Sequence, residues 1–114
     1  MEGPDGFTAG LSTYGATATT ADRYIVYKVD VVEGRFAGQT VETAVAIGEL
    51  ARWPLVPPHW VYLQDNVTFA ATNTQPCPLP GWLGHSRQIV GWGNDPDPIA
   101  GWIAHVRGVI GEAT

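Results

Sequence analysis

One cysteine and one nearby histidine are the residues of this chain whose chemistry suggests catalysis. Cys77 is the only cysteine and lies in a loop between two prolines, so it is the one candidate nucleophile. A thiolate attacks well only when it is exposed. His85 follows in the segment between Trp82 and Trp92, and its ordinary pKa suits proton transfer. Both have structural alternatives, because a lone cysteine often packs as a small apolar group and a histidine between tryptophans can be a hydrogen-bonded core residue.

A second group of residues suggests contact with a partner. Trp60 alternates with Val61 in a short apolar segment, so we expect it to face outward beside His59 as a partner-binding patch. Arg87 can anchor a carboxylate or the backbone of a partner, or it can form a structural ion pair. His59 and His105 also have structural interpretations. The three histidines have no local spacing typical of a zinc site, so neither a metal nor a bound cofactor is expected.

Composition narrows the class of protein. The chain has 114 residues, 45% hydrophobic and 15% charged, which predicts one globular domain. Its net charge is −5 and its six basic residues are scattered, which argues against nucleic acid as a partner. A lone cysteine excludes an internal disulfide and suits a reducing compartment. No apolar run approaches the roughly 18 residues of a membrane span, and no signal peptide is apparent, so we expect no membrane partner and a cytoplasmic location.

The elements that must position these residues follow from the pattern along the chain. Residues 1–20 are rich in Gly, Thr and Ala, which predicts a flexible N-terminal arm, and 21–114 then form the folded domain. Alternation predicts strands over 24–32 and 40–47, joined as a hairpin through the glycine turn at 34–38. The prolines of 53–58 predict a rigid extended corner.

The second half of the chain is less regular. A third strand is expected over 59–63, with weaker strand signals near 67–71 and 88–90. Asp97 and Pro98 are typical of a helix start, and apolar residues at helical spacing predict a helix to about residue 110. The fold class is therefore α+β: an antiparallel β-meander with a Pro-Pro corner and a C-terminal helix packed on the sheet.

Three short motifs occur in an order that resembles one known family. They are the turn Gly34-Arg35-Phe36-Ala37-Gly38, the corner Trp53-Pro54-Leu55-Val56-Pro57-Pro58 and the strand His59-Trp60-Val61-Tyr62-Leu63. With the later Trp92 and the terminal helix, they resemble the ubiquitin-conjugating (UBC/RWD-like) superfamily over about residues 24–110, and the Trp82-to-Trp92 segment looks like that of its prokaryotic branch. The family's N-terminal helix is not expected from residues 1–20, and its His-Pro-Asn motif is absent.

The resemblance implies a function and site roles. Cys77 would accept a ubiquitin-like modifier from an activating enzyme as a thioester and pass it to an amine. ATP would be used by that enzyme, so no cofactor is implied. Asn73, or else Asn66, would stabilise the oxyanion as the family's asparagine does; each is alternatively a turn asparagine bonded to its own loop. A second hypothesis is an inactive adaptor of the same fold that binds a ubiquitin-like protein or another subunit. A third is a small α+β binding module unrelated to ubiquitin.

Overall fold

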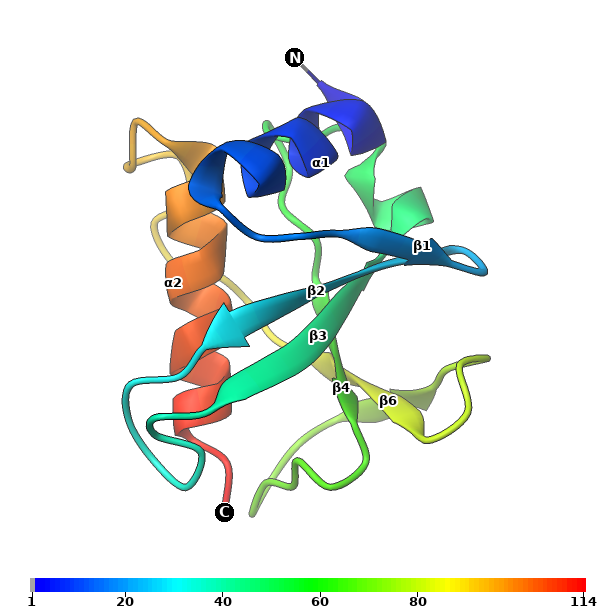
Figure 1. Cartoon of the computed structure of the whole chain (residues 1–114), viewed down its shortest axis with the longest axis vertical. Helices are drawn as coiled ribbons and strands as arrows, with labels where there is room; N and C mark the ends of the chain where they lie inside the picture. The colour runs from blue at the N-terminus through cyan, green and yellow to red at the C-terminus, as the bar shows by residue number, and fades with distance from the viewer. Residues whose placement is uncertain (1) are drawn as a thin grey trace.

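A computed structural model describes residues 2–114 and shows an α+β domain in which two helices pack on one antiparallel sheet (Figure 1). The strand order is β1-β2-β3-β4-β6-β5. We call the face of the sheet under the helices the inner face and the opposite one the outer face. The elements are α1 (Gly3–Tyr14), β1 (Thr19–Ala21), β2 (Tyr24–Asp30), β3 (Thr40–Ala46), the 3-10 turn η1 (Ile47–Leu50), β4 (Trp60–Gln64), β5 (Thr74–Pro76), β6 (Trp82–Ser86) and α2 (Pro98–Gly111).

The predicted hairpin is confirmed. β2 and β3 pair antiparallel from Tyr24 opposite Ala46 to Asp30 opposite Thr40, slightly shorter than the predicted strands. The turn between them uses positive φ at two glycines, 79° at Gly34 and 81° at Gly38, a conformation that side chains with a Cβ resist. Alternation along β2 buries Ile25, Tyr27 and Val29 on the inner face. The outer face of the strand carries Tyr24 and Val26 first and then the exposed Lys28 and Asp30.

The C-terminal helix is also confirmed. Asp97 caps α2, because its Oδ1 accepts hydrogen bonds from the backbone N–H groups of Ile99 (3.1 Å) and Ala100 (3.4 Å). The apolar residues predicted to share one face are all buried against the sheet: Ile99, Trp102, Ile103, Val106, Val109 and Ile110.

The N-terminal segment differs from its prediction as a flexible arm. Residues 3–14 form α1, with Pro4 in the first turn and Gly15 in the left-handed conformation just after the helix. Phe7 and Leu11, one helical turn apart, are 0% exposed and belong to the main core. The glycines and threonines around this pair hide its spacing, and burial against the rest of the domain stabilises a helix of low intrinsic propensity.

The proline corner is turned rather than extended. The backbone N–H of Val56 donates to the carbonyl of Arg52, one helical turn earlier (3.1 Å). Trp53 is buried edge-to-face against Phe7, with ring centroids 5.0 Å apart. Its carbonyl also accepts a hydrogen bond from the N–H of Gly3 (2.9 Å), so the corner is held by α1.

Two strands lie elsewhere than the weaker signals predicted. Neither 67–71 nor 88–90 is a strand. Residues 82–86 instead form β6, which pairs with β4, and residues 74–76 form β5, the last strand at that edge of the sheet. Pro76 fits this edge, where a missing N–H breaks no interior ladder. β6 contains a glycine and a serine and has little apolar alternation, so its pairing with β4 is set by tertiary contacts.

Candidate functional site

Cys77 lies directly after β5 and packs on the outer face of the sheet. It is partly buried against a small cluster built on Tyr24, Ala44 and Tyr62. The rings of Tyr24 and Tyr62 meet edge-to-face at 4.9 Å. Burial, reinforced by the neighbouring Cys77 side chain, raises the pKa of the Tyr24 hydroxyl well above its usual range. A partly buried thiol in such a cluster can pack as a small apolar group.

His85 lies on the inner face. In the β4–β6 pairing Val61 is opposite His85 and Tyr62 is opposite Gly84, so His85 and the outer-face Tyr62 point to different sides of the sheet. The His85 side chain is 2% exposed, and its Nδ1 lies 2.9 Å from the Thr72 hydroxyl. Burial lowers its pKa, and the positive charge of Arg87 lowers it further. A sheet separates this imidazole from Cys77.

Asn73 precedes β5 and is exposed, as is Asn66 in the turn after β4. The carbonyl of Asn73 accepts a hydrogen bond from the N–H of Ser86 (2.9 Å), which continues the β5–β6 ladder. Because the intervening strand is extended, the four steps from Asn73 to Cys77 span about 13 Å. The structure therefore does not bring Cys77, Asn73 and His85 together as one catalytic group.

The residues expected to bind a partner lie in two separate places. His59 and Trp60 are neighbours, with ring centroids 5.6 Å apart, and Trp60 packs half-buried on the outer-face cluster. The backbone N–H of His59 donates to Glu49 Oε1 (2.9 Å), which fixes the start of β4. Arg87 instead stacks over the ring of Phe69, 4.7 Å from its centroid, and donates from Nη1 to the Thr72 hydroxyl (3.0 Å) beside His85.

An apolar surface that the sequence analysis did not identify lies at the proline corner. Leu55 is 70% exposed and Val90 is 95% exposed, although both are large apolar side chains. They line one hollow of about 470 Å³ together with other residues of the corner and of the loop before α2. We call the following residues the corner patch: Pro54, Leu55, Ile89, Val90 and Trp92.

The corner patch has a fixed base. The indole N–H of Trp92 donates to the carbonyl of Pro54 (2.9 Å), and the rings of Trp53 and Trp92 lie 5.4 Å apart. The two loops that form the patch are thus joined to each other and to the core. Contiguous exposed apolar surface of this kind is typical of protein contact sites. A signal was present in the sequence, where Leu55 and Val56 stand between prolines that exclude them from a regular buried element.

The described part of the chain gives no sign of a metal centre or a spanning helix. Within residues 2–114, no group of three or more His, Cys, Asp or Glu side chains is placed to hold a metal ion. None of the helices in that range combines the length and apolar character needed to cross a bilayer.

Comparisons with known proteins return no relatives. No protein-family model, no curated protein and no solved structure matches this chain.

Proposed function

We propose that this chain is a ubiquitin-conjugating-like adaptor that binds a ubiquitin-like protein or another protein subunit without forming a thioester. The observation that carries the proposal is the position of Cys77, which packs against Tyr24 on the outer face while His85 is buried on the inner one. A conjugating enzyme needs a reactive thiolate and groups that act on it together.

Several features support the protein-binding part of the proposal. The motif order of the sequence resembles the UBC/RWD-like superfamily, and an N-terminal helix, usual in that family, is present as α1. The corner patch offers exposed Leu55 and Val90 on a base fixed by Trp92. A contiguous exposed apolar patch of this kind is typical of surfaces that bind other proteins.

The corner patch supplies the first test. The double variant Leu55→Asp, Val90→Asp places charges on exposed positions, so it should fold with a free energy of unfolding within about 0.5 kcal/mol of the wild type. It should lose binding to ubiquitin-like proteins and to the products of neighbouring genes in a two-hybrid or titration panel. The matched control Val32→Asp, at another exposed apolar position (74% exposed), should keep that binding.

The second test addresses catalysis directly. The wild-type chain is incubated with a ubiquitin-like protein, its activating enzyme and ATP, and the products are separated with and without reductant. The adaptor proposal expects no reductant-sensitive adduct on Cys77 and unchanged partner binding by Cys77→Ala. An adduct that disappears in Cys77→Ala would replace the adaptor with the conjugating enzyme.

A further inference from the structure

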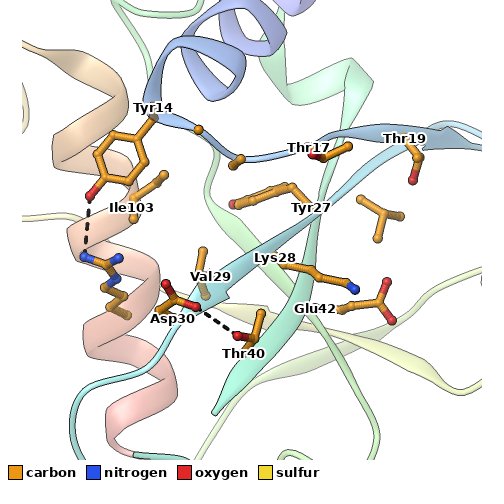
Figure 2. A pocket seen from close by; sticks show the side chains of 14 residues that line it. Tyr14, Thr17, Thr19, Tyr27, Lys28, Val29, Asp30, Thr40, Glu42 and Ile103 are labelled. Atoms are coloured by element: carbon orange, nitrogen blue, oxygen red, sulfur yellow. Dashed lines mark hydrogen bonds between the residues drawn. The ribbon is translucent and has the colours of Figure 1, made fainter. Parts of the chain in front are cut away.

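The strand β2 is paired along only half of one edge. β1 covers residues 24–26 of β2, with Thr19 opposite Val26 as the last pair. Before Thr19 the chain turns away toward the end of α1. No strand of the described chain lies beyond that point on this edge, so the segment from Tyr27 to Asp30 borders an open space there (Figure 2).

The backbone polar groups of Lys28 and Asp30 point into that space. Hydrogen bonds between Arg23 and Ile47 (2.9 Å) and between Val31 and Gln39 (2.9 Å) bracket the β2–β3 ladder. Hydrogen-bonded positions alternate in an antiparallel pair, so the odd residues of β2 bond to β3 and the even ones face the other edge. Beyond β1, Lys28 and Asp30 have no strand to receive their N–H and C=O groups within residues 2–114.

A groove of about 540 Å³ lies along this edge. Its walls are the segment after α1, the free half of β2 and one side of α2. Tyr14 and Ile103 stand at one end of the groove and Thr19 at the other (Figure 2). Residues 26–30 of β2 all line the groove, so an extended chain that lay in it would run beside this strand.

The inner side of the groove carries one cationic residue, Arg107 of α2. Its Nε is buried and has no hydrogen-bond partner among residues 2–114. Its Nη1 donates only a long bond, 3.5 Å, to the hydroxyl of Tyr14. A buried guanidinium nitrogen without an acceptor is costly, and a carboxylate is the acceptor whose planar geometry it matches best.

We infer that the groove binds an extended segment of a partner protein, which adds to the free half of β2 as an antiparallel strand and places a carboxylate on Arg107. The backbone of the segment would pair with Lys28 and Asp30. A side chain opposite Val29 would point to the inner face, toward Ile103 and Arg107, because directly opposite residues share a face. The inferred ligand class is therefore an acidic β-strand peptide. This site is separate from the corner patch and does not depend on the adaptor role.

The experiment begins with a selection of binding peptides. The full chain is immobilised and used to select displayed random peptides of about eight residues, long enough to extend past the free half of β2 at about 3.3 Å per residue. We expect enrichment of sequences with alternating apolar residues and one Asp or Glu. One selected peptide is then synthesised and titrated against the wild type and three variants.

The variants separate backbone pairing from side-chain contact. Lys28→Pro removes an N–H that faces the groove and leaves the β2–β3 ladder intact, whereas Lys28→Ala changes only the side chain. Affinity should fall about tenfold or more in Lys28→Pro and in Arg107→Gln, and should change little in Lys28→Ala. Far-ultraviolet circular dichroism and thermal melting establish that each variant is folded.

Hydrogen exchange of the wild-type chain tests the same inference without any variant. The peptide should slow hydrogen exchange at the amides of Lys28 and Asp30, while those of Tyr27 and Val29 are already protected by β3. The inference is overturned if no peptide is enriched, or if Lys28→Pro binds as well as the wild type and the two amides are unaffected. It is also overturned if the same edge instead forms a dimer of this chain that Lys28→Pro dissociates.

Discussion

The indole N–H of Trp102 donates a hydrogen bond to the hydroxyl of Tyr27, 2.7 Å away, in the centre of the protein. Trp102 belongs to α2 and is 0% exposed, and Tyr27 belongs to β2 and is 1% exposed. The bond therefore joins the C-terminal helix to the sheet by a polar contact inside an apolar core. Burial raises the pKa of Tyr27 well above its usual range, so the hydroxyl stays protonated as pH rises.

Removing either partner of this bond should destabilise the fold. Tyr27→Phe leaves the indole N–H without an acceptor, and Trp102→Phe leaves the hydroxyl without its donor and also removes ring volume. Each change should lower the free energy of unfolding by about 1–3 kcal/mol, with Trp102→Phe the larger. Urea titration of both single variants and the double variant measures the coupling. The coupling would be contradicted if the double variant lost as much free energy of unfolding as the two single variants together.

The core position of α1 predicts a large effect of truncating its main aromatic residue. Phe7 makes edge contacts with Tyr27 (5.9 Å), Trp53 (5.0 Å) and Trp102 (6.5 Å). Phe7→Ala should lower the free energy of unfolding by about 3–5 kcal/mol. The neighbouring exposed position supplies the control, since Thr8→Ala should stay within about 0.5 kcal/mol of the wild type. Equal stability of the two variants would mean that α1 is not part of the cooperative fold.

Two turn glycines with the same φ should respond differently to alanine. A Cβ on Gly34 would lie 2.2 Å from the carbonyl oxygen of Gly111, whereas a Cβ on Gly38 would meet nothing within 4 Å. Gly38→Ala should cost roughly 1–2 kcal/mol from the left-handed conformation alone. Gly34→Ala adds a clash between two backbones and should lower the melting temperature clearly further. Equal melting temperatures would show that the turn moves away from α2 without cost.

One buried and one half-buried histidine predict a loss of stability on mild acidification. Burial lowers the pKa of His85 and His105, and the charge of Arg87 adds to both effects. In the unfolded chain these imidazoles take up protons near pH 6.5, before the folded chain does, so protonation favours unfolding as pH falls below that value. The double variant His85→Phe, His105→Phe should show a shallower decline in chemical denaturation between about pH 7.5 and 5.5.

Glu49 should have the opposite effect to the histidines on stability as pH falls. Burial raises the pKa of its carboxyl despite the hydrogen bonds from the backbone at His59 and Trp60, so the folded chain takes up this proton before the unfolded chain does. Protonation of Glu49 therefore adds stability as pH falls. Glu49→Gln should make the acid-side decline steeper than in the wild type, and a shallower decline would reverse the assigned sign.

The elements that the sequence predicted well are those with a local physical cause. Alternation determines which residues of β2 enter the main core, and positive φ favours glycine at positions 34 and 38. Asp97 with Pro98 begins a helix whose apolar residues recur once per turn. These causes act over a few neighbouring residues, so they are visible in the sequence without knowledge of the rest of the fold.

The tertiary structure decided what depends on distant parts of the chain. α1 is stable because Phe7 and Leu11 are buried in the main core, and residues 82–86 form β6 because they pair with β4 on one side and β5 on the other. Cys77 and His85 are close in sequence, yet the sheet separates them. Strand pairing and register decide on which face of the sheet a residue lies. That pairing joins segments far apart in the chain, so the spacing of residues in the sequence does not reveal it.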